Sequence, residues 1–438
     1  MTLQSAKVYS LRQRLILTLI LLTIVHVGCF IPVPYIDREN FANLFVGDKS
    51  SMNPVVGILN TFSGGGTSSF GLLSLGILPY LNASIIMQLV ATASPSLAKL
   101  QKEEGEYGRR KLTEYTRYLT FIWAIIDSIG VTYSLRSLVF DWNVWTSFQI
   151  GLSLISGSMI VLWFSELITR DGLGNGSSLL ICFNIVASLP DQLKTLAIAL
   201  QNKSSYTLFL LAGIFLLTTL ACVLLNEAIV KIPLVSAWQL LKITEKDSYW
   251  ENTTLPLRLN QVGVMPLVFT SSVMVILSSF ARFLTAQLES LSILSISNSF
   301  QLLVYQWVGK ILFWVCYGVL IFFFTNFYST IILDPKEVAE QFRKNSVIIK
   351  GLSPGLPTEK YLKETLERLS RINAIILMIL VIFINGLESW LNIGATTLRG
   401  FGLTSQIILV NVLIDTLRRI SSLLNAEEVR KNAEEDKK

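Results

Sequence analysis

Apolar stretches long enough to cross a lipid bilayer recur along this entire 438-residue chain, and they constrain its fold more than any other feature. The hydrocarbon core of a bilayer is about 30 Å thick, and a helix satisfies its own backbone hydrogen bonds there. Hydrophobic residues make up 52% of the chain and charged residues 15%, which is unlike a soluble domain of this length. We therefore predict an all-α polytopic membrane protein, not a soluble domain with an anchor.

Hydropathy windows of about 19 residues place ten transmembrane helices along the chain. They lie near residues 15–32, 77–93, 117–138, 148–168, 177–190, 206–230, 262–282, 302–331, 372–392 and 400–417. Ten spans put both termini on one side of the membrane. If that side is cytosolic, 28 of the 36 Lys and Arg residues are cytosolic and the other eight lie outside. The positive-inside rule thus predicts cytosolic N- and C-termini.

The connection between the first two spans, residues 33–76, is unusually apolar for a loop and contains a glycine-rich run. One interpretation is a short piece that folds back into the membrane. An ordinary surface loop with an interfacial helix explains the composition equally well. The residues that suggest a folded-back piece are Phe62, Ser63, Gly64, Gly65, Gly66 and Phe70.

Two cytosolic connections, residues 99–117 and 332–371, are rich in basic residues. For the first, a positive-inside anchor explains most of the charge. The second has two helix-like pieces, 335–344 and 358–371, around a turn-rich centre. A loop so long and basic indicates a docking surface for an acidic or phosphate-bearing partner. The docking candidates are Arg109, Arg110, Lys111, Lys350, Lys360 and Lys363.

Ionisable residues at membrane depth, which ion-coupled transporters require, are few in this chain. Asp127 lies within a span, and the other acids lie near span ends, where caps or pairs with Arg are the better interpretation: Glu166, Glu227, Glu388 and Asp415. The chain has no Ser-His dyad, HExxH helix or zinc cluster, and its four cysteines lack paired spacings. We predict no catalytic residue, no metal site and no cofactor.

Uncharged polar residues are more frequent at mid-span positions. Asn82, Ser84 and Gln88 lie on the second predicted span, and three others flank or enter the seventh: Asn260, Ser271 and Ser272. Such side chains are costly against lipid, so they should face another helix or an aqueous cavity. They indicate either hydrogen bonds that hold helices together or a seam between helices that must part.

Several segments of the chain closely resemble the SecY family. They are GILPYLNASIIMQL from Gly76, EGEYGRRKLTEYTRYLT from Glu104, GLGNGSSLLI from Gly172, LPLRLNQVGVMPLVFTSS from Leu255, FYSTIILDPKEVAEQF from Phe327 and PGLPTEKYL from Pro354. The likeness is collinear and covers nearly the whole chain. It implies two inverted, pseudo-symmetric halves, residues 1–190 and 191–438, that close like a clamshell around a central pore.

The resemblance also implies roles for particular residues. A plug at about Thr61–Leu72 fills the external funnel, and a lateral gate lies between the second and seventh spans, with Asn82, Gln88, Asn260 and Ser272 at it. The hydrophobic pore ring consists of Ile77, Leu81, Ser177, Ile181, Val268 and Ile408. A narrow apolar constriction of this kind resists ion leakage because it dewets.

The sequence departs from the family pattern at three places. Ser177 is polar where the family usually has an aliphatic residue, which weakens the ring there or removes that residue from it. Ser353 stands where an Arg usually precedes Pro-Gly. The 6/7 loop, residues 231–258, carries only four basic residues, fewer than the family's Arg-rich form. The last two departures suggest altered contact with a motor or with ribosomal RNA.

The resemblance implies a channel that passes unfolded polypeptides and releases hydrophobic segments into lipid. It implies a SecE-type subunit, with a SecG-type subunit as an additional candidate, and the SecA ATPase or a ribosome as the driving partner. The chain has no GxxxxGK[ST] motif, which fits an external motor. A solute transporter and a structural insertion scaffold are the alternatives. The stretches NQVGVMP, GSSLLI and CFNIVASLP are most similar to the cyanobacterial and plastid-encoded branch, which favours a thylakoid membrane over a bacterial plasma membrane.

Overall fold

The computed structural model describes residues 10–36, 71–94, 96–97, 100, 105–134, 136, 139–200, 205–236, 254–263, 265–274, 277, 299–390 and 403–435. Contacts between residues divide the chain into two compact units. The first unit is Met1–Ser205 with Asn392–Ser405 and Val412–Lys438, and the second is Tyr206–Leu391 with Gln406–Asn411.

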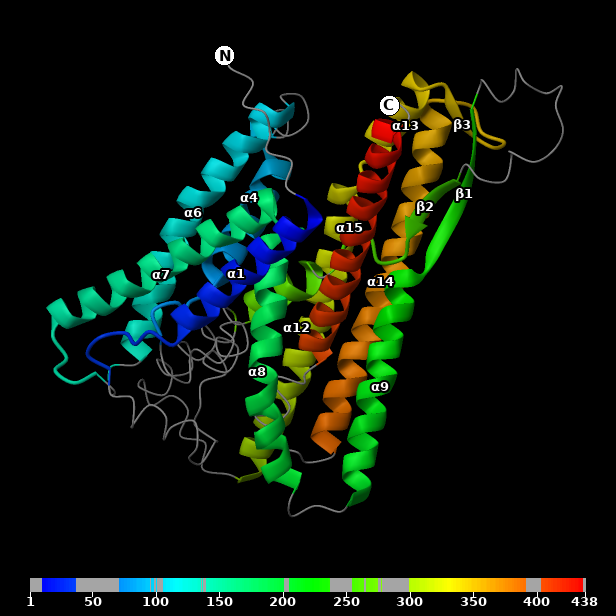
Figure 1. The fold of residues 1–438 in the computed structure, drawn as a ribbon. Helices are drawn as coiled ribbons and strands as arrows, with labels where there is room; N and C mark the ends of the chain where they lie inside the picture. The colour runs from blue at the N-terminus through cyan, green and yellow to red at the C-terminus, as the bar shows by residue number, and fades with distance from the viewer. Residues whose placement is uncertain are drawn as a thin grey trace, which may run out of the picture. The chain divides into compact units, whose positions relative to one another are not determined.

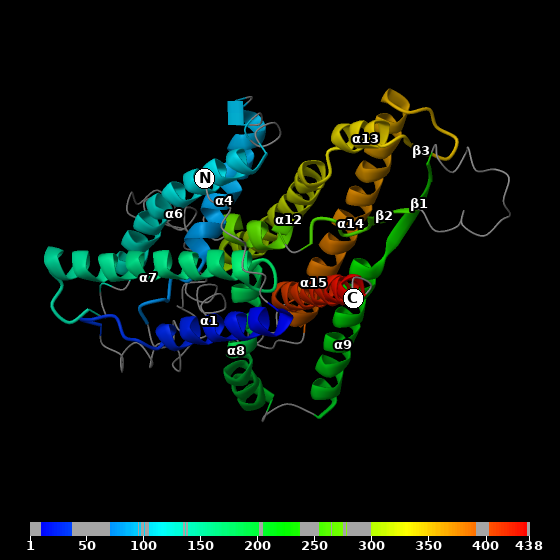
Figure 2. The ribbon, with the colours of Figure 1, turned by 45° about the horizontal axis from the view of Figure 1, so that its top comes forward.

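Long helices build the first unit. They are α1 (Leu11–Cys29), α4 (Leu78–Ala93), α6 (Gly105–Ser134), α7 (Val144–Asp171) and α8 (Gly176–Leu200). Neighbours along the chain pack together, α4 on α6, α6 on α7 and α7 on α8, while α1 lies alongside α7, as Figure 2 shows. Most of α15 (Leu403–Glu435) also belongs to this unit.

Two of these helices begin at residues whose local sequence favours a helix start. Ser10 and Gln13 form a capping box at the start of α1, with each side chain bonded to the other's backbone N–H. Before α4, Gly76 adopts a positive φ of 55°, which suits a residue without Cβ, and Pro79 lies in the first turn of the helix. Both helices therefore begin where short-range chemistry favours a start.

A buried turn, residues 71–76, connects the first predicted loop to α4. The Leu72 N–H donates to the Ile31 carbonyl at 2.7 Å, and the Ser158 hydroxyl donates to the Gly76 carbonyl at 3.3 Å. Gly157 on α7 faces this turn so closely that a Cβ there would lie 2.1 Å from the Leu72 carbonyl oxygen. The turn is thus held between α1 and α7.

The second unit combines helices with a small sheet. Its helices are α9 (Ser205–Glu227), the helix Met265–Met274, α12 (Ser299–Ile332), α13 (Pro335–Lys344) and α14 (Leu356–Trp390). Its strands are β1 (Ile229–Ser236), β2 (Thr254–Arg258) and β3 (Val347–Ile349). In Figure 1, β1 continues from the end of α9, and α12 packs along α14.

The three strands form one antiparallel sheet with the order β2-β1-β3. Ile232 lies opposite Leu255 in the first pairing, and Leu234 lies opposite Ile349 in the second. Most of β1 and all of β2 belong to the 6/7 loop, and β3 belongs to the connection 332–371, called the 8/9 loop here. The central strand β1 therefore joins the two loops into one structure.

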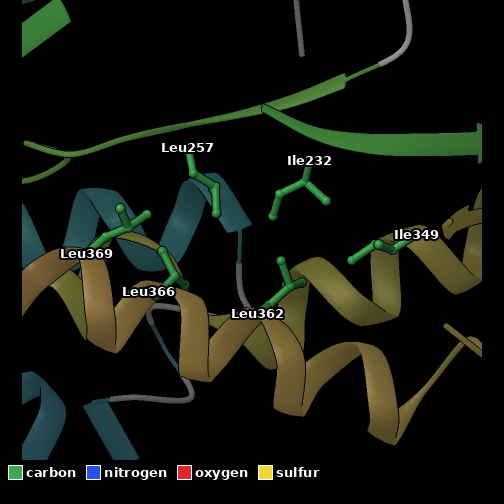
Figure 3. Packing of buried hydrophobic residues seen from close by; sticks show 6 residues of the cluster. All are labelled: Ile232, Leu257, Ile349, Leu362, Leu366 and Leu369. Carbon is green, nitrogen blue, oxygen red and sulfur yellow. The ribbon is translucent and has the colours of Figure 1, made fainter. Parts of the chain in front are cut away.

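One face of the sheet packs on the first turns of α14 (Figure 3). The buried side chains of this cluster are Ile232 and Leu257 from β1 and β2, Ile349 from β3, and Leu362, Leu366 and Leu369 from α14. The three leucines recur at intervals of four and three residues, which places them on one face of the helix. The sheet and α14 therefore share a hydrophobic core.

The all-α membrane fold is confirmed, with a three-stranded sheet that the sequence reasoning did not predict. Each of the ten predicted spans overlaps a helix in the described residues, but the first extends past the end of α1 at Cys29 and the sixth extends into β1, which begins at Ile229. Parts of 117–138, 262–282, 372–392 and 400–417 lie outside the described residues. Among the described residues, three helical segments meet length and hydropathy limits for crossing a membrane: Leu11–Cys29, Val144–Asp171 and Trp314–Lys344, the last of which runs from α12 into α13. The helix 335–344 is confirmed, and 358–371 is the first part of α14. The division at residue 190 stays a prediction.

Candidate functional site

The predicted pore-ring residues of the first unit are all buried. Ile77 and Leu81 are 1% and 2% exposed at the start of α4, and Ile181 is 3% exposed on α8. Ile77 is the N-cap of α4, and its carbonyl accepts the Leu81 N–H at 3.1 Å. These two side chains are therefore one helical turn apart on one face.

Ser177 has a partner for its hydroxyl close by in the chain. Its Oγ donates to Asn175 Oδ1 at 2.7 Å, and its backbone N–H reaches the same oxygen at 3.2 Å. The preceding residue, Gly176, donates its N–H to the Thr169 hydroxyl at 2.8 Å. Ser177 thus takes part in the hydrogen bonds at the start of α8. Its polar side chain is satisfied there by a neighbour in the sequence.

The two ring candidates of the second unit are also buried, each 1% exposed. Val268 lies on the helix Met265–Met274, and Ile408 lies on the part of α15 that belongs to this unit. Val268 is followed by Phe269, whose ring lies 4.9 Å from that of Tyr328 on α12. The convergence of all six ring residues on one pore stays a prediction.

The predicted plug residues lie outside the described part of the chain. They are Thr61, Phe62, Ser63, Gly64, Gly65, Gly66 and Phe70. The turn 71–76, which follows them, is described and mostly buried. This turn is held in place by its close contacts with α7 and with the residues at and after the end of α1.

The predicted gate residues have different surroundings. Asn82 and Gln88 on α4 are half-buried, whereas Asn260 and Ser272 are each 6% exposed. Asn260 is bonded within its own unit, since its Nδ2 donates to Asn226 Oδ1 at 2.9 Å and its Oδ1 accepts from Asn373 at 3.2 Å. In this structure Asn260 therefore forms hydrogen bonds between helices. Its role at a gate stays a prediction.

The cluster around Asn260 is the group of residues that sequence reasoning missed. Asn226 on α9, Asn373 on α14 and Asn411 on α15 are all buried, and Asn226 donates to Asn411. Each of these three lies inside a predicted span. An uncharged amide at membrane depth was the available signal, but the sequence does not show which amides meet.

The predicted docking residues are solvent-accessible wherever their side chains are described. Lys350, Lys360 and Lys363 are exposed, the last two on α14. On α6, Arg110 pairs with Glu106 at 2.8 Å, and Lys111 lies 5.9 Å from the centre of the Tyr107 ring. The side chain of Arg109 lies outside the described set. Ser353 is exposed at the turn before α14.

Glu166 pairs with an arginine, which is one of the two interpretations that the sequence allowed. Arg117 on α6 donates from Nε and an Nη to the two carboxylate oxygens of Glu166 on α7, both at 2.7 Å. Such bidentate pairs are stronger than single charge-assisted bonds. The pair therefore connects α6 and α7 near their predicted cytosolic ends.

Comparisons with known proteins agree with this arrangement. The family model described as SecY matches residues 71–417. A curated relative, "Protein translocase subunit SecY" of Vaucheria litorea, is 58% identical over 431 residues, covering 97% of this chain and 98% of that protein. Its counterpart from Synechocystis sp. is 43% identical over 433 residues, with coverages of 96% and 93%.

Three solved structures share the fold at low identity. "The structure of a protein conducting channel" aligns with a TM-score of 0.64 and 16% identity over 95% of this chain and 94% of that one. A structure titled for a SecY plug domain that stabilises the closed state and maintains a membrane seal aligns at 0.61 and 16%, covering 95% and 93%. Sec61 in a canine ribosome-channel complex aligns at 0.60 and 15%, covering 95% and 94%.

Proposed function

Because this chain belongs to the SecY family, we propose that it is the channel subunit of a protein translocase. It passes unfolded polypeptides across the membrane and releases hydrophobic segments laterally into lipid. The observation that carries this proposal is the family match over residues 71–417, which includes every described ring and gate candidate. In this proposal the chain itself makes and breaks no bond, and a partner supplies the energy.

The seal is proposed to combine the apolar ring with the plug. A narrow ring of aliphatic side chains excludes water and ions, and it yields to a passing chain because the side chains can move apart. The burial of Ile77, Leu81, Ile181, Val268 and Ile408 supports their use in such a constriction. Ser177 is the weakest candidate, since its hydroxyl is bonded to Asn175.

The seal is tested by ion conductance of the reconstituted complex. Ile181→Gly should raise resting conductance, whereas Val186→Gly should not, because Val186 lies on the same helix but is 45% exposed. A deletion of residues 61–70 should also raise conductance while sparing the turn that contacts Gly157. Conductance unchanged in both Ile181→Gly and the deletion would reject this assignment of the seal.

Crosslinking distinguishes the channel from its rivals. A photo-reactive residue at position 181 should crosslink to a stalled secretory chain, and one at position 186 should not. A structural insertion scaffold has no axial pore and would give no crosslink at position 181. A solute transporter would instead move a small solute in an uptake assay and would need ion-binding acids at mid-span.

Driving partners are proposed to dock on the joined 6/7 and 8/9 loops. Exposed Lys360 and Lys363 lie on the side of α14 away from the buried leucines, so their charges are accessible. Reversing both to Glu should weaken binding of a SecA ATPase or a ribosome and reduce its salt sensitivity, because such charges are screened over about 10 Å at 0.1 M salt. Lys194→Glu is the control, since this exposed residue lies on the predicted opposite side. If binding survived the double reversal, the docking proposal would be rejected, and these charges would only be solvated residues that fix the orientation of the membrane helices.

We further propose cytosolic termini, a SecE-type partner and a thylakoid location. Positive-inside charge supports the orientation, and the relatives from Vaucheria litorea and Synechocystis support the location. In sealed vesicles, a membrane-impermeant thiol reagent should reach a cysteine at position 360 from the stromal side and one at position 194 from the other. Co-purification in mild detergent identifies the resident small subunits and motor.

A further inference from the structure

Four buried asparagines of the second unit form a continuous chain of hydrogen bonds. Asn373 donates to Asn260 at 3.2 Å, Asn260 donates to Asn226 at 2.9 Å, and Asn226 donates to Asn411. Their exposed fractions are 1%, 6%, 6% and 2% in that order. The chain therefore joins α14, the entry to the helix Met265–Met274, α9 and α15 through neutral amides.

Asn260 is the central member because it also sets the backbone that leads into the helix Met265–Met274. Its Oδ1 accepts the Gly263 N–H at 3.1 Å, and Gly263 has a positive φ of 65°. The residue lies two positions after the end of β2, whose core packs on α14. The amide cluster thus holds the beginning of the helix that carries Val268 and Ser272.

The stripe of α14 that packs under the sheet continues into the cluster. Leu362, Leu366 and Leu369 are followed by Asn373 and then buried Leu377, at intervals of four, three, four and four residues. One face of one helix therefore contacts both the cytosolic sheet and Asn260. The joined loops and the segment that leads into the helix Met265–Met274 are therefore connected through contacts on one face of α14.

The cluster is suited to rearrangement as well as to holding. Asn373 Oδ1 and Asn411 Nδ2 are buried and have no hydrogen-bond partner among the described residues, so one acceptor and one donor are in reserve. Neutral amides exchange partners without separating charge, and hydrogen bonds between membrane helices are individually weak. A contact between helices that is held by neutral amides therefore presents only a modest barrier to separation of the helices, unlike a contact held by a buried ion pair.

We propose that Asn226, Asn260, Asn373 and Asn411 are positioning residues that form an asparagine latch, which holds the helix Met265–Met274 in its resting place and sets how apolar a segment must be to open the channel sideways. The inference rests on the proposed function, because it needs that helix to be a moving wall of a channel. Cutting the latch at either end destabilises the resting state because it removes one interhelical bond, while Asn260 keeps its bond to the Gly263 N–H and Asn226 keeps its bond to the Cys222 carbonyl.

The test uses the translocase reconstituted with its SecE-type and SecA-type partners and a series of reporter segments graded in Leu and Ala. Asn373→Leu and Asn411→Leu should each let less apolar segments enter lipid, and should raise export of a precursor with a shortened signal about threefold to tenfold, the range expected for one interhelical hydrogen bond. Export of a precursor with a strong signal should stay as in the parent.

Ser370→Ala is the matched control. Ser370 also lies on α14 and donates to Asn326 on α12 at 2.8 Å, so this variant removes an interhelical hydrogen bond that does not involve the latch. It should leave the insertion threshold unchanged. The double variant of Asn373 and Asn411 should match either single variant, because both cut one chain of bonds, whereas independent effects would add.

Hydrogen exchange provides a second measurement if the leucine variants fail to fold. In Asn373→Ser, amides of the helix Met265–Met274 should exchange faster while those of α12 remain protected. A threshold that does not move, one that moves equally in Ser370→Ala, or additive effects in the double variant would overturn the latch and leave the channel function intact. A parent complex that secretes no reporter at all would overturn the proposed function itself.

Discussion

In the first unit, helices and turns approach one another at glycines, whereas in the second they meet through aromatic rings and amide groups. Gly157 faces the Leu72 carbonyl, and a Cβ on Gly176 would lie 2.0 Å from the Ser165 carbonyl oxygen. In the second unit, by contrast, a Cβ on Gly318 would meet the flexible side chain of Met378 at 3.1 Å, and Gly213 has open space.

This difference indicates different mechanical properties. Small residues let backbones pack closely in lipid, where no hydrophobic force drives helices together, and such contacts tolerate little displacement. We expect aromatic rings to slide over one another with a smaller loss of contact energy, and amides to exchange hydrogen-bond partners. Phe269 lies near both Phe324 and Tyr328 of α12, which gives its helix an apolar surface to move along. We expect the first unit to be the more rigid support.

The largest expected effect comes from the hydrophobic core between α14 and the sheet of the second unit. Leu366→Ala removes a buried side chain between α14 and the sheet, which should destabilise that region by about 2–5 kcal/mol. Leu356→Ala is the control, because Leu356 is on the same helix and is 80% exposed. Hydrogen exchange of β1, β2 and β3 should rise in the first variant alone. Equal protection in both would show that the loops are held by something other than this core.

The rigidity of the first unit is tested next. Gly157→Ala forces a methyl group against the Leu72 carbonyl, and overpacking of this kind costs about 1–3 kcal/mol. Gly130→Ala on α6 has no atom within 4 Å of its new Cβ and should be neutral or stabilising. Thermal unfolding in detergent measures both. A Gly157→Ala protein as stable as Gly130→Ala would remove the basis for calling this unit rigid.

A smaller effect is expected at α13, which lies within the 8/9 loop of the second unit. The Asp334 side chain caps this helix by accepting the Lys336 N–H at 3.1 Å, and losing such a cap costs about 1 kcal/mol. Asp334→Ala should speed hydrogen exchange at Pro335–Lys344, and Asp334→Asn should retain protection. Glu340→Ala, at an exposed position on the same helix, should change little.

The smallest effect is expected from the ion pair of the first unit. Arg117 and Glu166 have side chains 50% and 26% exposed, so their coupling in a double-mutant cycle should be at most about 1 kcal/mol and should fall with added salt. Arg117→Gln and Glu166→Gln complete the cycle. The more exposed pair Arg110 and Glu106 should couple more weakly still. A coupling of Arg117 with Glu166 that resisted salt would mean that this unit also depends on buried polar contacts.

Several features of this protein were determined by the sequence alone. The predicted spans overlap helices in the described residues because hydrophobicity accumulates locally along the chain, although their ends differ by a few residues. The helix 335–344 was predicted with its observed bounds, and the structure shows that Asp334 caps it and Pro335 lies in its first turn. For Glu166 the sequence indicated either a helix cap or a pair with an arginine, and the structure identified the partner as Arg117, 49 positions away.

Only the tertiary structure decided which distant residues meet. Asn226 and Asn411 are 185 positions apart, and Asn260 and Asn373 are 113 apart, so no local pattern joins them. The strands β1 and β3 pair across two different loops, and β3 is only three residues long, too short to show alternation. Hydropathy is a sum over neighbours in sequence, whereas hydrogen-bond pairing and close glycine contacts depend on which helices are neighbours in space. That choice is made by packing.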